Sequence, residues 1–495
     1  MAELKHNKNL LFSIGITIFY AVITLVCVFH HEIWSDEAQV WMLCKHLNLV
    51  ELFKHLVNEG HPSLFYLLTM PFAKFSDNII FQQLICWLCS VASIFLIWNY
   101  SKFNNLTKTI LTFSSPFLFH FSVIARNYSL VPILICILAI LQTKTKEHPI
   151  LYAIALALMA NTHAIMFPFS FLLGAYFLYK NFDEIKNKNK SFIVSILIMT
   201  FGFLALVVQL VGTTQSNVAI TFEYFSGIDA FVRVVMLSIF NSFDEYFIKS
   251  NATYFNLYSI LMFVFMVIAQ ILSVVILFKK DKKLFFLLFL SIGAQIAIYT
   301  FTYAFHIFAT RVYCGFMIVL FCYWVFLDKN KENKIDVKWT NIVIALLFGL
   351  TLINGVKNYY GDIVFDYTPS KRMATFIKNN IDPKTSLIFS DSPGYAITTA
   401  FYLEPTHNVY WSVNSKPLKY VVWKSHLLFD EERWTSYFEF LSDKEKGKEL
   451  YALVNYNPFL EKTATIFNPN KFELIYVTSP SIFPSEMFRI YKFKK

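Results

Sequence analysis

The sequence predicts a polytopic α-helical membrane protein that ends in an α/β domain outside the membrane. Hydrophobic residues make up 56% and charged residues 15% of the 495 residues, whereas an ordinary soluble chain is about 25% charged. The apolar residues also form runs close to the roughly 20 residues that cross a bilayer as a helix. The segment 357–495 breaks this pattern, because it holds 18 basic and 15 acidic residues. The same composition excludes a disordered chain, a collagen-like repeat and a small disulfide scaffold.

Apolar runs predict eleven membrane spans, several of them short enough to tilt or merge. The spans are 10–29, 78–99, 107–121, 128–142, 149–161, 164–180, 191–211, 254–277, 284–303, 310–327 and 339–356. The first span is long and no small-residue cleavage site follows it, so it predicts an anchor rather than a removed signal peptide. The chain then divides into a membrane domain over 1–356 and an outer domain over 357–495.

The distribution of Lys and Arg predicts the orientation. With the N-terminus in the cytoplasm, the inner loops hold 18 basic and 8 acidic residues, and the outer loops before the tail hold 7 basic and 10 acidic residues. An excess of basic residues marks the cytoplasmic side. We therefore predict a multi-pass plasma-membrane protein with a cytoplasmic N-terminus and an extracytoplasmic C-terminal domain. An endoplasmic-reticulum protein with a lumenal face is the alternative. Because membrane orientation explains the net charge of +10, the predicted partner is the bilayer and not nucleic acid.

Two outer loops are large, 30–77 and 212–253. In the first, apolar residues recur at helical spacing over 37–57 with a polar opposite face, and Pro62 can start a second helix over 63–75. These patterns predict two juxtamembrane helices that lie along the interface. The second loop is predicted to be a mobile lid, and Glu223 on it is a candidate substrate-binding residue.

The C-terminal segment is predicted to be a compact α/β domain. Helix-like stretches cover 369–380 and 424–443, and Asp391-Ser392-Pro393-Gly394 is interpreted as a structural strand-to-helix turn. Short β-type runs predict strands at 386–390, 450–454, 472–477 and 487–493.

Five polar motifs stand at predicted outer ends of spans or juxtamembrane helices. The motifs are Trp34-Ser35-Asp36-Glu37-Ala38, Glu59-Gly60-His61-Pro62, Ala125-Arg126-Asn127-Tyr128, Asn161-Thr162-His163 and Arg311-Val312-Tyr313. Each one alone has a structural interpretation. Ser35 or Asp36 can be a helix N-cap, His61 can lie exposed in a turn, and Arg126 can reach lipid headgroups.

Taken together, the motifs indicate a functional site, because the predicted topology puts all five on one side of the membrane at the same depth. Ionisable groups are costly at such positions and mark functional cavities. A cavity with a carboxylate, two arginines and several histidines suits an anionic, phosphorylated ligand, since a guanidinium can hold two phosphate oxygens at once.

The Asp-Glu pair after the first span, the Gly-His-Pro before an apolar helix and the Ala-Arg-x-Tyr at the third outer boundary resemble GT-C glycosyltransferases. The pattern is similar above all to bacterial aminoarabinose transferases and to protein O-mannosyltransferase-like enzymes of the family 39/83 type. The resemblance covers roughly residues 10–360. It implies a GT-C fold and transfer of a sugar from a polyprenyl-phosphate donor to a hydroxyl acceptor, which would be a cell-envelope glycan, a lipid or a protein.

The resemblance also implies roles for single residues. Asp36, with Glu37 beside it, matches the catalytic acidic position, and His61 and Arg311 match positions that contact the donor phosphate. Some relatives carry a second acidic residue near the third motif. This chain has no carboxylate there, so Arg126 is predicted to act instead.

Sugar transfer needs a group that activates the incoming hydroxyl and groups that stabilise the leaving phosphate. Asp36 is predicted to act as a general base. Arg311, with Arg126 or His61, is predicted to stabilise the phosphate charge. A single base opposite one leaving group predicts inversion at the anomeric carbon. Tyr313 completes the predicted phosphate site, and the remaining predicted substrate-binding residues are Tyr128 and His163.

No fixed metal-ligand spacing and no glycine-rich phosphate loop occur in the sequence. No metal site is therefore assigned, and a divalent cation (Mg or Mn) held by Asp36, Glu37 and His61 or His163 stays an alternative. The alternative to an enzyme is a lipid-linked oligosaccharide flippase or polymerase, or another membrane transporter. A transporter predicts internal repeats and charges near mid-membrane. The sequence instead places its charges at the outer rim.

Overall fold

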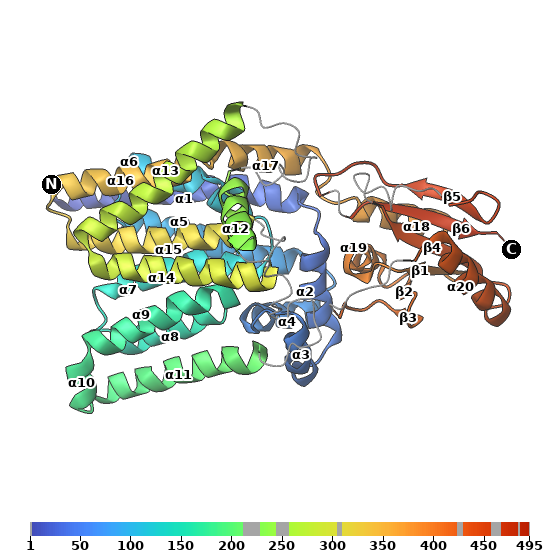
Figure 1. Cartoon of the computed structure of the whole chain (residues 1–495), viewed down its shortest axis with the longest axis horizontal. Helices are drawn as coiled ribbons and strands as arrows, with labels where there is room; N and C mark the ends of the chain where they lie inside the picture. Colours follow the sequence, from blue (N-terminus) through green and yellow to red (C-terminus); the bar gives the residue numbers. More distant parts are fainter. Residues whose placement is uncertain are drawn as a thin grey trace.

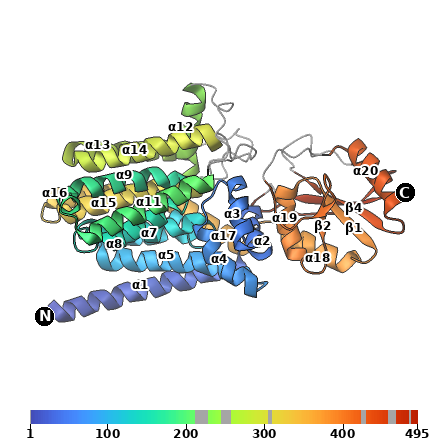
Figure 2. The same ribbon diagram turned by 90° about the horizontal axis from the view of Figure 1, so that it is seen from below.

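The computed structural model describes residues 2–210, 228–243, 257–303, 309–422, 429–456, 467–483 and 486–494. A long helical bundle occupies one end of the molecule and a small sheet domain the other, with the helices of the first outer loop between them (Figures 1 and 2). The chain begins at the end of the bundle that lies away from the sheet domain.

Each of the eleven predicted spans coincides with one helix or with two successive helices. Seven helical segments among the described residues are long and apolar enough to cross a membrane. The helices outside the first loop and the sheet domain are α1 (Ala2–His30), α5 (Ile80–Tyr100), α6 (Asn105–Phe113), α7 (Val131–Gln142), α8 (Pro149–Ala160), α9 (Phe167–Lys180), α10 (Phe182–Lys186), α11 (Lys190–Leu210), α12 (Ile228–Asn241), α13 (Leu257–Lys280), α14 (Lys282–Ile298), α15 (Ala309–Lys329), α16 (Lys334–Gly349) and α17 (Leu352–Val364).

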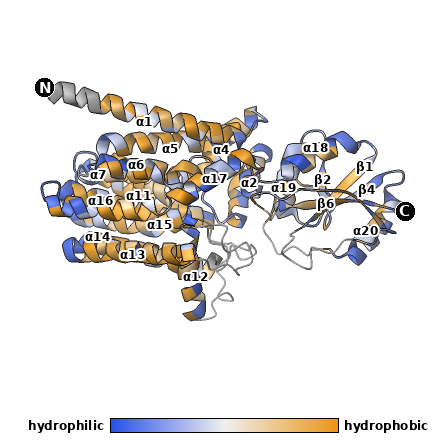
Figure 3. Cartoon of the chain, turned by 90° about the horizontal axis from the view of Figure 1, so that it is seen from above, coloured by the Kyte–Doolittle hydropathy of each residue, from blue (hydrophilic) through white to orange (hydrophobic). Residues whose placement is uncertain are grey.

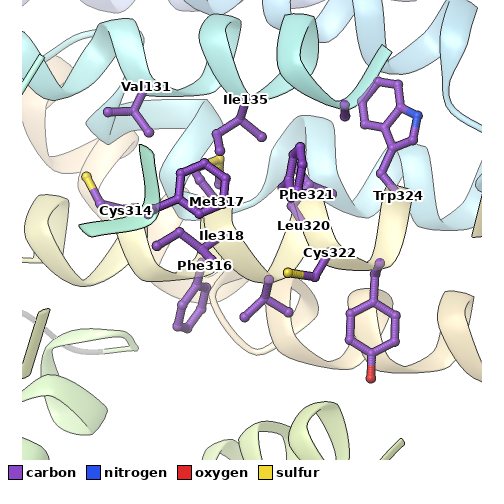
Figure 4. Packing of buried hydrophobic residues seen from close by; sticks show 14 of the residues in the cluster. Val131, Ile135, Cys314, Phe316, Met317, Ile318, Leu320, Phe321, Cys322 and Trp324 are labelled. Atoms are coloured by element: carbon purple, nitrogen blue, oxygen red, sulfur yellow. The ribbon is translucent and has the colours of Figure 1, made fainter. Parts of the chain in front are cut away.

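The centre of the bundle is α15, whose apolar stretch is 94% buried. Its side chains pack against Val131 and Ile135 of α7 (Figure 4). Surrounding helices such as α11 and α13 keep large apolar side chains on their outer faces, and hydropathy colouring shows the whole bundle as apolar with polar ends (Figure 3). An apolar surface of this extent needs lipid as its solvent.

Several predicted spans are not single helices, and two of them matter for the site. The run 107–121 is α6 followed by a π-helical turn, η2 (Pro116–His120), and the run 339–356 covers α16 and the start of α17. The backbones of α17 and η2 come close together because Gly355 has no side chain, and a Cβ there would lie 2.8 Å from the Cα of Ser115. His120, the last residue of η2, lies beside α17, with its Nε2 3.3 Å from Nδ2 of Asn358.

The first outer loop folds into α2 (Ser35–His46), α3 (Leu49–His55), a short turn η1 (Leu56–Asn58) and α4 (Leu64–Phe75). The predicted helix over 63–75 is confirmed. The single helix predicted over 37–57 is wrong, because the chain is extended at Leu47 and a new helix starts at Asn48, whose side chain accepts a hydrogen bond from the Glu51 amide. Nearly all of α2 is buried, since α4 and α19 (Pro393–Leu403) both pack against it.

The second outer loop contains α12 within its described part. Glu223 lies outside the described residues.

The sheet domain contains the four predicted strands, as β1 (Ser386–Ser390), β4 (Glu449–Asn455), β5 (Phe472–Val477) and β6 (Phe488–Phe493). Two short strands that the sequence did not indicate, β2 (Val409–Trp411) and β3 (Lys416–Pro417), extend it. The strand order is β3-β2-β1-β4-β6-β5, with β1 parallel to β2 and β4 and the other pairs antiparallel.

Helices cover both faces of this sheet. The predicted helix 369–380 is α18 (Ser370–Asn380), and the described part of the predicted helix 424–443 is α20 (Glu431–Lys444). Neighbouring residues of β1 point to opposite faces, so Ile388 packs with α18 and α19, and Phe389 packs with α20. The first of these cores continues without a break into α2 and α4, which joins the sheet domain to the first outer loop.

Candidate functional site

A small cavity of about 20 Å³ lies where the bundle, the first outer loop and the C-terminal domain meet. Its walls come from the start of α2, from η2 and the loop behind it, from η3 (Asn127–Leu130) and from the start of α15. The lining residues are Trp34, Asp36, His120, Ile124, Arg126, Tyr128, Thr310, Arg311, Tyr367 and Phe483. The cavity thus unites the first, third and fifth of the motifs found in the sequence.

Asp36 lies in the first turn of α2 and pairs with Arg126. The Asp36 side chain is 23% exposed, its Oδ2 lies 3.1 Å from Nη2 of Arg126, and Nη1 of Arg126 donates to its backbone carbonyl at 2.7 Å. The N-cap of α2 is Trp34, so neither Ser35 nor Asp36 has the capping role considered from the sequence. The Asp36 carboxylate is left to face the cavity at the N-terminal end of α2.

Glu37, the next residue, points away into the protein. Its side chain is fully buried, and its Oε1 accepts the Ala125 amide at 2.5 Å. Its Oε2 accepts the Trp34 amide at 3.1 Å and lies 3.0 Å from Nε2 of His31. The other ring nitrogen of His31, Nδ1, lies 2.9 Å from Asp362 on α17. Burial acts to lower the pKa of His31, but the carboxylates of Asp362 and Glu37 raise this pKa to about 10.

Basic and aromatic side chains form the opposite side of the site. Nη2 of Arg126 donates to Nε2 of His61 at 3.1 Å, and Nε of Arg311 donates to the Tyr128 hydroxyl at 2.9 Å. The His163 ring stacks on Tyr128 with ring centres 4.6 Å apart, and it lies 4.7 Å from the His61 ring. The second and fourth motifs therefore stand directly behind the cavity wall, in contact with the residues that line it.

The two histidines of this wall are neutral. Burial, followed by the charges of Arg126 and Arg311, lowers the pKa of His61 well below its usual value. Burial also lowers the pKa of His163, with His61 and the same two arginines adding to the effect. A guanidinium offers only donors, so Nε2 of His61 must accept from Arg126 as an unprotonated nitrogen. The charged groups on the cavity are thus two guanidinium ions and one carboxylate, a net positive charge.

Tyr313, a predicted phosphate ligand, is not among the residues that line the cavity. Its hydroxyl donates to the Ser242 carbonyl at 3.0 Å, and its ring meets His120 edge-to-face at 5.0 Å. It supports His120, which the sequence analysis did not select. A histidine near the outer end of a predicted span was the signal that could have found His120.

Two lining residues, Tyr367 and Phe483, come from beyond the membrane helices. The Phe483 amide donates to the Tyr367 carbonyl at 2.8 Å, and the Phe483 ring meets Trp34 with ring centres 4.9 Å apart. No local pattern could have selected these two aromatic residues, because they reach the site through the docking of the sheet domain.

A metal site would need several ligands at one point. Within the described ranges, no group of three or more His, Cys, Asp and Glu side chains could hold a metal ion. The alternative set of Asp36, Glu37 and a histidine is divided here, because Asp36 faces Arg126 and Glu37 faces His31.

Neither a family model nor a curated protein sequence matches the chain. The overall fold is shared with a solved membrane protein, ArnT, one of the enzymes that the resemblance pointed to. Among the similar solved structures are two of ArnT from Cupriavidus metallidurans. The one bound to undecaprenyl phosphate has a TM-score of 0.50 and 10% identity, and the apo state has a TM-score of 0.43 and 12% identity. In both cases 97% of this chain and 98% of the ArnT chain are covered.

Proposed function

We propose that this protein is a membrane glycosyltransferase that moves a sugar from a polyprenyl-phosphate donor to a hydroxyl acceptor, with inversion at the anomeric carbon. One observation carries the proposal: a partly exposed carboxylate, Asp36, and two buried arginines, Arg126 and Arg311, converge on one cavity of a GT-C fold. These are the groups that the reaction needs, a base for the hydroxyl and cations for the leaving phosphate.

Arg126 and Arg311 bind the donor phosphate. Both are buried in the cavity wall, where few waters compete for the anion, so a charge-assisted hydrogen bond is stronger than at an exposed surface. Neutral His61 and His163 and the hydroxyl of Tyr128 support the two guanidinium groups without adding charge. The ArnT structure with the same fold is bound to undecaprenyl phosphate, which supports a polyprenyl phosphate as the lipid.

Asp36 acts as the general base. It takes the proton of the acceptor hydroxyl while the hydroxyl oxygen forms a bond to the anomeric carbon of the sugar. The bond from that carbon to the phosphate oxygen breaks with its electron pair, and the polyprenyl phosphate leaves as an anion held by Arg126 and Arg311. Because the acceptor enters opposite the leaving group, the anomeric configuration inverts.

Glu37 is a positioning residue in this proposal. Its bonds to the Ala125 amide and to His31 hold the start of α2 against the loop that carries Arg126. The base and the phosphate ligand are thereby kept within one hydrogen-bond length of each other.

The distribution of basic residues supports an extracytoplasmic site in the plasma membrane. The N-terminus is then cytoplasmic, and the domain over 357–495 lies outside with the cavity. The acceptor is a glycan, a lipid or a protein of the cell envelope. Mass spectrometry of envelope glycans from cells with and without the protein identifies the sugar and the acceptor together.

The biochemical test uses the purified full chain in lipid nanodiscs, undecaprenyl-phosphate-linked sugars and an envelope extract as acceptor. We expect release of undecaprenyl phosphate with transfer of the sugar, and loss of both in Asp36→Asn. The matched control is Asp77→Asn, the same change at a side chain in the same outer loop that is 84% exposed. Normal transfer by Asp36→Asn, or no transfer from any donor by the wild type, contradicts the proposal.

A further inference from the structure

Glu486, a residue of the C-terminal domain, reaches the first turn of α2. The backbone amide of Ser35 donates to its Oε1 at 2.5 Å, and the Ser370 hydroxyl donates to its Oε2 at 3.1 Å. Ser35 is the first residue of α2 and precedes Asp36 directly. The Glu486 side chain is fully buried, although burying a carboxyl group away from water is costly.

The surroundings of Glu486 favour the neutral form of its carboxyl group. Burial raises the pKa of Tyr395 and Tyr402 of α19, and the Glu486 carboxyl near them adds to this rise. Burial raises the pKa of Glu486 to about 8, against the hydrogen bonds from Ser35 and Ser370. At neutral pH the group is therefore largely a neutral acid, which glutamine imitates closely in shape.

The C-terminal domain holds α2 at a second point, one turn further along. Nε2 of Gln39 donates to the Val421 carbonyl at 2.8 Å, and the Val421 amide donates to Oε1 of Gln39 at 2.8 Å. Phe483, three residues before Glu486, lines the cavity against Trp34. The same domain thus fixes the start of α2, its next turn and one wall of the cavity.

We propose that Glu486 is a positioning residue for sugar transfer: by holding the Ser35 amide it fixes the first turn of α2 and so places Asp36 against Arg126 on the cavity. The inference rests on the proposed function and adds that the C-terminal domain is part of the catalytic unit. It does not give Glu486 any contact with the substrate.

The test compares Glu486→Ala with Glu486→Gln in the nanodisc assay, together with binding of undecaprenyl phosphate. Alanine leaves the Ser35 amide without its partner and frees the turn that carries Asp36. We expect kcat per folded molecule to fall about 10- to 100-fold, because small misplacements of a catalytic group are costly. The affinity for undecaprenyl phosphate changes less than about 3-fold, because the arginines stay in place. Glutamine restores kcat to within about 3-fold, since its carbonyl can accept from Ser35.

Two further variants keep the test decisive. Ser370→Ala removes the second partner of the Glu486 carboxyl and leaves α2 untouched, so a smaller fall in kcat is expected even where Glu486→Ala folds poorly. Glu432→Ala changes an exposed carboxylate of the same domain and leaves kcat at the wild-type level. Wild-type kcat in both Glu486→Ala and Ser370→Ala overturns the inference, and so does equal loss in Glu486→Gln and Glu486→Ala. Asp36→Asn, run in parallel, separates the two proposals, because its activity tests the base and not Glu486.

Discussion

Two charge clusters share the first turn of α2 and differ in almost every physical respect. The cavity cluster consists of Asp36, Arg126 and Arg311, and its carboxylate is 23% exposed. The buried cluster consists of Glu37, His31 and Asp362, in which the side chains of Glu37 and His31 are fully buried and bonded on several sides. Successive residues of a helix point about 100° apart, so adjacent carboxylates enter different surroundings.

This difference separates a carboxylate that can take part in a reaction from one that stabilises the fold. A carboxylate whose two oxygens are both engaged by the protein has no oxygen to offer a substrate, and removing it leaves buried partners uncompensated. A carboxylate on a cavity can exchange its partner during a reaction. We therefore expect substitutions in the cavity cluster to change activity and substitutions in the buried cluster to change stability.

The largest expected effect comes from exchanging each carboxyl for its amide. Asp36→Asn lowers the transfer rate by about 10²- to 10⁴-fold, the usual contribution of a general base, and leaves the melting temperature nearly unchanged. Glu37→Gln breaks a buried ion pair with His31, at a cost of about 3–5 kcal/mol in the free energy of unfolding. Melting temperatures and transfer rates of Asp36→Asn and Glu37→Gln, measured in nanodiscs, test both predictions. The comparison fails if Glu37→Gln melts like the wild type and Asp36→Asn does not.

Removing a guanidinium from the cavity gives the next largest effect. Arg311→Ala weakens undecaprenyl-phosphate binding by about 10- to 150-fold, because a hydrogen bond to a charged group contributes about 1.5–3 kcal/mol. Arg311→Lys retains part of the affinity, since lysine keeps the charge and loses the fork. Arg433→Ala, at an exposed arginine of α20, is the control and leaves binding unchanged. If Arg311→Ala and the control bind undecaprenyl phosphate with equal affinity, Arg311 is not part of the phosphate site.

The buried cluster predicts a dependence of stability on pH. The pKa of His31 is about 10 in the folded protein, above its ordinary value of 6.5, so the folded state binds this proton more tightly than the unfolded state does. The stabilisation is complete below pH 6.5 and is lost as the pH rises through 10. The wild-type melting temperature should therefore fall between pH 7 and pH 10, and the fall should be shallower in His31→Gln. If the melting temperature falls equally with pH in the wild type and in His31→Gln, the assignment to His31 is wrong.

The smallest effect is expected at His61. Its lowered pKa makes it neutral at physiological pH, so it supports Arg126 through one hydrogen bond and not through charge. His61→Gln should weaken undecaprenyl-phosphate binding about 2- to 12-fold, which corresponds to the loss of about 0.5–1.5 kcal/mol. A loss as large as that of Arg311→Ala, measured in the same binding assay, shows that His61 contacts the phosphate as a cation.

The sequence predicted the membrane architecture and the convergence of distant motifs well. Asp36, Arg126 and Arg311 were selected from three separate motifs, and the structure brings all three to one cavity. Boundary charges are rare enough in a membrane protein to identify a functional rim without a structure. The breaks at Leu47 and after Phe113 were not predicted, because apolar periodicity continues across both; the local signals at these breaks are the Asn48 cap and Pro116.

The amino-acid sequence by itself determined that apolar helices build a bundle and which polar segments gather at one end of it. Lipid cannot hydrogen-bond a backbone, so the lengths of the apolar runs and the polar motifs between them decide both features locally. Only the tertiary structure decided that Asp36 faces the cavity while Glu37 is buried, and that Phe483 and Glu486 complete the site from a separate domain. Those outcomes depend on the rotation of α2 and on the surface that the sheet domain presents to it, which are set by packing between residues more than 400 positions apart.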